Sequence, residues 1–455
     1  MNTRRDQPYK LESKFPFPIP SLRKDKADED KGMVTKSDAL LFTSKKNIVI
    51  KEEPGSIRQL GQDVIPTSSY KESSRAFLQT EAAAFHPSSQ DGDLGLSFIM
   101  ETPPSVFFSL EFINEQILEQ DTLFKNIPVG GLSALTYHPE KKHFLALSDA
   151  KGNRRGPPRF YKLKLNKKEE GKKYELELID QVLLQNKIGK PFKPIDPEGI
   201  SFFKSDYIFI SSEGVQLPYL MEPPGVFVFD SQGKWSSSWP LPDIYWTDDP
   251  SRRDIWGVKE NKAFEALTIN HEQNQLWLAT ESSLHQDDLI EVDASDKQYI
   301  RISRFDVEMA QMTGQFIYEM DSYIEINNFT GHNGLTDFFS VGDAKFLVVE
   351  RTYLKNNSIS GDRKTDNNLV RLFLTDCSRA SDISHYKKLN KGRIVTCGKK
   401  LVADLSAALG DVVDNIEGIT IGPEVSKGQY LLVLVSDNNF SRKQKTQFLF
   451  FHYSL

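Results

Sequence analysis

The chain has 455 residues, a net charge of −6 and 30 phenylalanines. This length allows either two or three average domains or one large all-β domain. The acidic balance offers no basic face for nucleic acid, and no apolar run approaches the roughly 18 residues of a membrane-spanning helix. We therefore expect no nucleic-acid partner and no membrane span.

Residues 1–104 differ in composition from the rest of the chain. They contain charge runs, serine clusters such as TSSYKESSRAF and few periodic apolar segments, a composition typical of a disordered or loosely attached extension. The first residues, MNTRRDQPYK, lead into no apolar core of a secretory signal. The sequence as written favours a cytoplasmic location and leaves the true compartment open.

Residues 105–455 consist of short apolar strands separated by Gly, Pro and Asp. Five segments share one form, an apolar strand followed by a second strand that ends in an acid. They are GGLSALTYHPEKKHFLALSD (130–149), PEGISFFKSDYIFISSE (197–213), FEALTINHEQNQLWLATE (264–281), NGLTDFFSVGDAKFLVVE (333–350) and IEGITIGPEVSKGQYLLVLVSD (416–437). They recur about every 68 residues, except that a polar insertion at 352–368 lengthens the last interval.

Each repeat continues with two further strands, except the last, which has only TQFLFFHYSL before the chain ends. The segment VFFSLEFINEQIL (106–118) precedes the first repeat and can supply the missing strand. Four-stranded units at this interval are typical of a β-propeller, and closing the last blade with an N-terminal strand leaves no free sheet edge. We predict an all-β propeller of five four-stranded blades, with six as the alternative if the insertion hides a blade.

Acidic residues flank the first two strands of the repeats. The residues before the first strand are Gly130, Glu198, Glu265, Asn333 and Glu417, and those at the end of the second strand are Asp149, Glu213, Glu281, Glu350 and Asp437. Turn chemistry also places acids at strand ends. However, the first strand of each blade lines the channel of a propeller, so the repetition would gather up to eight carboxylates at one mouth. We therefore favour a site.

A cation is the expected occupant of this carboxylate cluster. Crowded like charges raise proton affinities and favour binding of a cation. All-oxygen ligands suit Ca²⁺, with Mg²⁺ as the alternative, and the eight histidines show no zinc-ligand spacing. The candidate metal ligands are Asp149, Glu198, Glu213, Glu265, Glu281, Glu350, Glu417 and Asp437.

Basic residues occur in loops expected at the same mouth, where they could bind an anionic ester or phosphate. The candidate substrate-binding residues are Arg154, Arg155, Arg159, Lys259 and Arg442. Solvated loop charges are the alternative interpretation. A serine hydrolase is disfavoured because the sequence contains no G-x-S-x-G motif.

The two cysteines, Cys377 and Cys397, are too few and too far apart in the sequence to suggest a metal cluster. We interpret them as buried free thiols, with a disulfide between neighbouring strands as the alternative.

Four of the repeat segments carry a resemblance to a known family. VGGLSALTYHPEKKHFLALSD, PIDPEGISFFKSDYIFISSEG, NKAFEALTINHEQNQLWLATE and VVDNIEGITIGPEVSKGQYLLVLVSDNNF resemble, in order, the phytase-like family (esterase-like activity of phytase). The likeness covers residues 105–455. It implies a β-propeller hydrolase of phosphate or carboxylic esters, and family members are often exported, unlike this chain as written.

The more distant analogy with β-propeller phytases implies several Ca²⁺ ions at the channel mouth. It would assign Glu198, Glu213, Glu265, Glu281, Glu417 and Asp437 to metal binding and the basic loop residues to binding phosphate. Glu198, Glu265 and Glu417 are the residues expected to hold the metal-bound water. This chain departs from a uniformly acidic mouth in the fourth repeat, which opens with Asn333 and ends with Glu350-Arg351. That departure leaves the number of metals open.

Two functions remain as hypotheses. The first is a monomeric, metal-dependent hydrolase acting on an anionic small-molecule ester. The second is a propeller without catalytic activity that serves as a ligand-binding or protein-interaction platform, since the fold hosts many functions.

Overall fold

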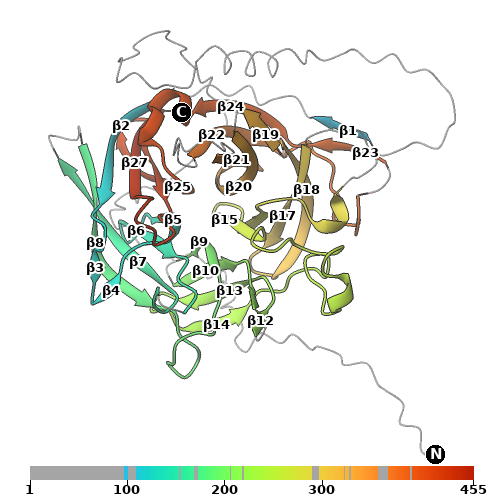
Figure 1. The fold of residues 1–455 in the computed structure, drawn as a ribbon, viewed down its shortest axis with the longest axis horizontal. Helices are drawn as coiled ribbons and strands as arrows, with labels where there is room; N and C mark the ends of the chain where they lie inside the picture. The colour runs from blue at the N-terminus through green and yellow to red at the C-terminus, as the bar shows by residue number, and fades with distance from the viewer. Residues whose placement is uncertain are drawn as a thin grey trace, which may run out of the picture.

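The repeats fold into five sheets arranged in a ring, as the computed structural model shows (Figure 1). The structure describes residues 97–100, 109–152, 155–168, 173–204, 206–217, 220–288, 297–321, 323–326, 329–356, 367–389 and 392–454. Neighbouring inner strands contact one another around the whole ring. The predicted five-bladed propeller is therefore confirmed.

Each blade contains four antiparallel strands, and blade 4 carries one more. Blade 1 consists of β5 (Leu132–His138), β6 (His143–Ser148), β7 (Arg159–Lys168) and β8 (Lys173–Leu183); blade 2 of β9 (Pro197–Phe203), β10 (Tyr207–Ser212), β13 (Gly225–Asp230) and β14 (Trp235–Ser238); blade 3 of β15 (Phe264–Asn270), β16 (Gln275–Thr280), β17 (Lys297–Asp306) and β18 (Gln311–Asp321); blade 4 of β19 (Tyr323–Ile326), β20 (Phe329–Gly342), β21 (Lys345–Asn356), β22 (Asn367–Asp376) and β24 (Gly398–Asp404); and blade 5 of β25 (Ile416–Ser426), β26 (Gln429–Ser436), β27 (Thr446–Ser454) and β2 (Ser109–Leu118).

The last blade joins the two ends of the propeller. Its outermost strand, β2, pairs antiparallel with β27 along the full length of both strands, from Ser109 opposite Ser454 to Leu118 opposite Thr446. This pairing is the predicted closure by an N-terminal strand, and it occupies the edge that β27 would otherwise expose.

The remaining elements are short. They are the parallel pair β1 (Ser97–Met100) with β23 (Arg393–Thr396), the hairpins β3 (Leu123–Phe124) with β4 (Ile127–Pro128) and β11 (Val215–Leu217) with β12 (Leu220–Glu222), the helix α2 (Leu405–Leu409), and the turns η2 (Pro250–Arg252), η3 (His285–Asp287) and η4 (Gly410–Val412). Strand β1 lies within the segment 1–104 assigned to the extension. No helix among the described residues is long and apolar enough to cross a membrane.

Apolar side chains fill the spaces between neighbouring blades. Each of the five interfaces has its own buried cluster, for example Leu145 and Leu147 of blade 1 with Ile208 and Ile210 of blade 2. Burial of these aliphatic and aromatic side chains supplies the main driving force for closing the ring. The polar groups of the inner strands are thereby held at fixed positions around the axis.

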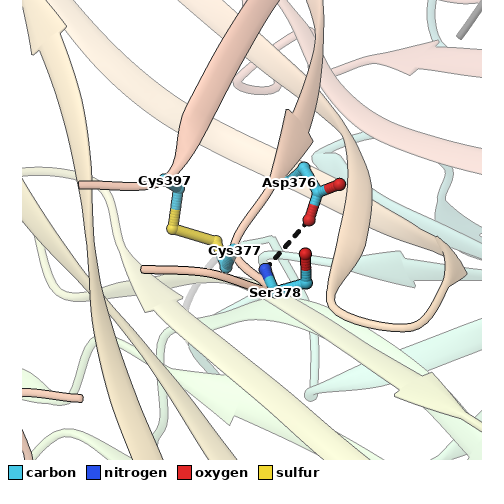
Figure 2. Close-up of a disulfide and its surroundings, with 4 residues drawn as sticks. All are labelled: Asp376, Cys377, Ser378 and Cys397. Atoms are coloured by element: carbon cyan, nitrogen blue, oxygen red, sulfur yellow. Dashed lines mark hydrogen bonds between the residues drawn. A yellow bond between two sulfur atoms is a disulfide. The ribbon is translucent and has the colours of Figure 1, made fainter. Parts of the chain in front are cut away.

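The two cysteines form a disulfide, so the expectation of free thiols is wrong (Figure 2). Both residues are buried, and their Cα atoms lie 4.3 Å apart although 20 positions separate them in sequence. The Cys397 N–H donates to the carbonyl of Ile317 in β18 at 2.8 Å. Between the cysteines, Ile383, Leu389 and Ile394 pack on Ile317. The disulfide therefore closes a segment that fastens blade 4 to blade 3.

Replacing both Cys377 and Cys397 with Ser should lower the free energy of unfolding by about 3 kcal/mol, because the unfolded chain loses a loop closure of this size. Urea unfolding of the double variant and the parent, both in chelator, measures the difference. A loss below about 0.5 kcal/mol would show that the segment holds its place without the bond.

Candidate metal centre

A β-bulge interrupts every inner strand at the same place. In blade 3, for instance, Phe264 pairs with Thr280 and Ala266 with Ala279, which leaves Glu265 without a partner in the register. The residues at this position in blades 1 to 5 are Ser133, Glu198, Glu265, Thr336 and Glu417. Bulges re-aim side chains beside functional sites. Here three of the five are glutamates.

This register corrects the sequence alignment in two blades. Gly130 and Asn333 were expected to match the three glutamates, but Ser133 and Thr336 occupy those positions. Their hydroxyls donate to carbonyls of the next inner strand, Ser133 to Pro197 at 3.1 Å and Thr336 to Ile416 at 3.2 Å. These two side chains therefore join blades. Of the three glutamates, Glu198 and Glu265 accept no hydrogen bond from a described residue, whereas Glu417 accepts from Arg351 and Asn415.

The glycines after Glu198 and Glu417 allow the blades to approach closely. A Cβ atom at Gly199 would lie 2.7 Å from the Glu265 carbonyl oxygen of blade 3, and one at Gly418 would lie 2.9 Å from the Cα of Ala134 in blade 1. Neither distance is compatible with a side chain. The repeated Glu-Gly pair thus combines a site carboxylate with a close inter-blade contact.

The second strands contribute a further set of charged residues, which follow directly after the strand in blades 1, 2, 3 and 5 and lie within β21 in blade 4. On the second strand of each blade, one residue pairs with the inner-strand residue just before the bulge. The next residue along the second strand is Asp149, Glu213, Glu281, Arg351 and Asp437 in blades 1 to 5. Four of these are acids, as predicted. Blade 4 places Arg351 at the position where the other blades have a carboxylate.

Glu350, predicted as a metal ligand, points away from this group. In the register it matches Ser148, Ser212, Thr280 and Ser436, which are buried between strands. Its carboxylate forms an ion pair with Lys399 of β24 and accepts a 2.7 Å hydrogen bond from the Tyr318 hydroxyl. Successive side chains of a strand face opposite sides, so Arg351 lies on the face that Glu350 was expected to occupy.

Asp196 joins the acids and was not anticipated from the sequence. It lies directly before β9, and its carbonyl accepts the N–H of Glu213 at 2.9 Å. The motif DPEG contains two acids separated by one residue, which is the signal that could have revealed it. With Asp196 the carboxylate cluster comprises Asp149, Asp196, Glu198, Glu213, Glu265, Glu281, Glu417 and Asp437, all of them buried.

Two groups within the carboxylate cluster have the spacing of metal ligands. One consists of Asp196, Glu198 and Glu213, and the other of Glu213, Glu265 and Glu281; in each group one oxygen per residue lies within 4.8 Å of the others. Calcium binds oxygens at 2.3–2.6 Å, so oxygens on opposite sides of one ion lie about 5 Å apart. Glu213 belongs to both groups.

The cluster also contains oxygens with no partner of their own. Asp149 Oδ1 and Asp196 Oδ1 are buried and accept no hydrogen bond from any described residue. A buried acceptor without a donor is unfavourable. The donor set is purely oxygen, so a hard cation such as Ca²⁺ fits the residues present.

Burial raises the pKa of Asp149, Glu198, Glu213, Glu265, Glu417 and Asp437, and repulsion from neighbouring carboxylates adds to the effect. The pKa of Glu213 rises to about 8, through burial and then through Asp196 and Glu281, and that of Asp149 rises to about 7 despite Arg155. The pKa values of Glu198, Glu265 and Asp437 lie well above their usual range for the same primary reason. Protons and cations therefore compete for this cluster.

Four basic side chains partly balance the acids. Lys151 pairs with Asp196, Arg155 with Asp149 at 2.7 Å and Lys262 with Glu281 at 3.0 Å. Arg351 pairs with Glu417 and, at 3.3 Å, with Glu281. Eight carboxylates face four basic side chains, so the acidic groups of the cluster outnumber the basic ones.

The predicted substrate-binding residues are only in part beside the cluster. Arg155 lies beside the cluster, because it pairs with Asp149. The Arg159 guanidinium is fully buried and donates to the Tyr161 hydroxyl and to the carbonyls of Pro128, Arg155 and Pro157. Lys259 binds Asp288 at 2.7 Å and Ser283 at 3.1 Å, and the exposed Arg442 pairs with Asp121. Arg154 lies outside the described residues.

The raised pKa of Glu213 predicts a pH-dependent stability. The folded chain keeps a proton on Glu213 up to about pH 8, whereas the unfolded chain releases it near pH 4.5. This contribution to stability is therefore complete below the unfolded pKa and is lost as the pH rises through the folded value. In chelator, Glu213 should make the free energy of unfolding of the parent fall as the pH rises, by at most about 1.4 kcal/mol per pH unit. Glu213→Gln should lack this part of the fall.

Urea unfolding at pH 6.5, 7.25 and 8 measures this slope. The range begins above the window in which His271, whose pKa burial lowers to about 4, contributes a slope of opposite sign. Parallel pH profiles for Glu213→Gln and the parent would contradict the assignment.

The fold and the site together define a five-bladed β-propeller with a buried, all-oxygen carboxylate cluster at one end of its inner strands. A family model described as phytase-like, esterase-like activity of phytase, matches residues 127–440. That range contains all five inner strands and the whole carboxylate cluster. The chain belongs to the phytase-like family.

Three solved structures are distantly similar to the chain. A member of the DUF4221 family from Bacteroides vulgatus is 10% identical, with a TM-score of 0.34, over 74% of this chain and 81% of that chain. An N-acetylgalactosamine deacetylase from F. plautii is 8% identical, with a TM-score of 0.37, over 76% and 95%. A periplasmic gluconolactonase from Pseudomonas aeruginosa is 11% identical, with a TM-score of 0.27, over 61% and 90%. These likenesses carry no argument about activity. No curated protein sequence matches the chain.

Proposed function

We propose that this protein is a metal-dependent hydrolase of phosphate or other esters that acts at the carboxylate cluster. The observation that carries the proposal is the pair of carboxylate groups that share Glu213 and have the spacing of cation ligands. Membership of a family with esterase-like activity supports the reaction class. Calcium is the proposed ion and magnesium the alternative, since both bind oxygen ligands.

The proposed metal ligands lie mainly in blades 2 and 3. Asp196, Glu198, Glu213, Glu265 and Glu281 supply them, and Asp149, Glu417 and Asp437 extend the set into blades 1 and 5. A bound calcium ion would supply charge neutralisation and Lewis acidity toward an ester oxygen. The ion requires six to eight oxygens, which several monodentate carboxylates and water can provide.

Glu198, Glu265 and Glu417 are the residues proposed to hold the attacking water. They project from the bulges of β9, β15 and β25 and are each about 8% exposed. No described residue donates a hydrogen bond to Glu198 or Glu265, so their oxygens can accept one from water. A raised pKa suits a carboxylate that takes a proton from water near neutral pH.

The proposed substrate is an anionic ester. Lys151, Arg155 and Lys262 lie around the cluster and keep about a third of their side-chain surface exposed, at 32%, 31% and 37%. Cations at the entrance to a buried acidic cluster would offset its repulsion of an approaching anion.

A propeller that binds calcium without turnover is the second candidate. One observation favours it: the described members of the predicted anion-binding set, Arg155, Arg159, Lys259 and Arg442, all have protein partners. An anion would have to compete with these partners. In that case calcium would stabilise the ring and no ester would be cleaved.

The deciding experiment measures product release from phytate, simple phosphate monoesters and simple acyl esters by the full chain, in calcium and in chelator. Calcium-dependent turnover supports the hydrolase and ranks the ester classes. Calcium binding without turnover on any ester would replace the hydrolase with the second candidate. Turnover that persists in chelator would reject the metal dependence.

A further inference from the structure

Arg351 occupies a position that four of the five blades give to an acid. The pairing of Leu335 with Glu350 and of Asp337 with Val349 makes Arg351 the counterpart of Asp149, Glu213, Glu281 and Asp437. A charge of opposite sign therefore stands inside the carboxylate cluster itself. The other three cations, in contrast, belong to loops around it.

The guanidinium of Arg351 is held by the blades on both sides of its own. Its Nη1 donates to Glu417 and, at 2.5 Å, to Asn415 Oδ1, both of blade 5, and its Nη2 donates to Glu281 of blade 3 at 3.3 Å. The nearby acids raise the Arg351 pKa despite burial. Arg351 is thus a permanent positive charge, positioned by two neighbouring carboxylates.

The hydrogen bonding of Arg351 is incomplete. Its Nε is buried and donates to no described residue, and the Nη2 contact with Glu281 is long for a charge-assisted bond. Meanwhile Glu281 is one of the three acids in the group of Glu213, Glu265 and Glu281. A cation held by this group would draw the Glu281 carboxylate away from Nη2 and so leave a guanidinium edge with free N–H donors.

We propose that Arg351 binds the anionic group of the substrate, a phosphate or carboxylate, beside the cation held by Glu213, Glu265 and Glu281. The inference rests on the proposed function for the place of the cation. A guanidinium offers a planar pair of donors that matches two oxygens of either anion. Because Glu281 is shared, the cation and the anion each favour binding of the other, by the same factor.

The test measures binding of inorganic phosphate and of acetate to the full chain by isothermal titration calorimetry, in dilute calcium and in chelator. Arg351→Gln should weaken phosphate binding at least about tenfold, and Arg351→Lys should weaken it less, since Lys keeps the charge and loses the planar pair of donors. Calcium should strengthen phosphate binding to the parent and have a smaller effect in Arg351→Gln. The two anions show which group is preferred.

Arg371→Gln is the matched control. Arg371 lies on the neighbouring strand β22, its side chain is 16% exposed like that of Arg351, and it faces Glu350 on the other side of the blade. This variant should bind phosphate like the parent. Circular dichroism checks that each variant is folded; if Arg351→Gln is not, Arg351→Lys decides, because it leaves no buried acid without a cation.

The outcomes separate this inference from the proposed function. Calcium binding together with equal phosphate binding by the parent, Arg351→Lys and Arg351→Gln overturns the role of Arg351 and leaves the hydrolase proposal standing. Absence of calcium binding to the parent rejects the proposed metal centre, whereas phosphate binding that still depends on Arg351 in chelator keeps Arg351 as an anion-binding residue. Absence of anion binding to the parent overturns the inference.

Discussion

Glu213→Gln should weaken calcium binding at least about a hundredfold while the propeller remains folded. Glu213 belongs to both groups of carboxylates with cation-ligand spacing, so its replacement removes one anionic ligand from either position of the ion. Calcium affinity depends strongly on the number of charged ligands, and a hundredfold loss corresponds to about 2.7 kcal/mol. Isothermal titration calorimetry of the two proteins at pH 8 measures the loss directly.

The control is the same substitution at a buried glutamate outside the cluster. Glu350→Gln should bind calcium like the parent, because Glu350 faces Lys399 and Tyr318 rather than the cluster. It should nevertheless be less stable, since Lys399 loses its carboxylate partner. Equal calcium affinity in Glu213→Gln and the parent would refute the proposed centre, and a loss in Glu350→Gln would refute the placement of Glu350.

Arg301→Met should cost about 3–5 kcal/mol of stability, the largest effect we expect from a single substitution outside the carboxylate cluster. Arg301 and Asp287 are fully buried and paired, with Nε at 2.6 Å and Nη2 at 3.0 Å from the two carboxylate oxygens. Asp287 also accepts the Leu389 N–H at 3.0 Å. Methionine retains much of the volume and leaves the Asp287 charge buried without its cation.

Urea unfolding measures this cost, with Lys125→Met as the comparison. Lys125 pairs with Asp180 at 2.8 Å, but its side chain is 58% exposed, and such surface pairs contribute about 0–1 kcal/mol. Similar losses in the two variants would contradict the view that burial determines the strength of the effect. Calcium binding should be unchanged in both variants, because neither ion pair touches the carboxylate cluster.

The exchange of positions between Glu350 and Arg351 shows how the sequence can predict a carboxylate cluster and still misassign one of its members. Aligning the repeats on their small residues placed Glu350 with the four other acids. The structural register shifts blade 4 by one position in the middle of β21, at Glu350 and Arg351, and a one-residue shift turns a side chain to the opposite face of a sheet. No local pattern in NGLTDFFSVGDAKFLVVER marks where the bulge falls.

The repeat carried most of the architecture. Apolar strands of similar length, separated by turn residues, indicate four-stranded blades even when the pairing between strands is unknown. The interval between the repeats indicates the number of blades. The closing role of residues 106–118 followed because the last repeat lacked a strand. The glutamates Glu198, Glu265 and Glu417 were identifiable because each lies beside a small residue at the start of an inner strand.

Contacts between segments distant in the chain had to be seen in three dimensions. Packing against another blade or strand places Asp196 in the cluster, buries Arg159 as a donor to carbonyls and brings Cys377 to Cys397. Sequence periodicity reports which face of a strand is apolar. It contains no record of the register between strands or of the distance between blades, and these two quantities set where each charge in the carboxylate cluster lies.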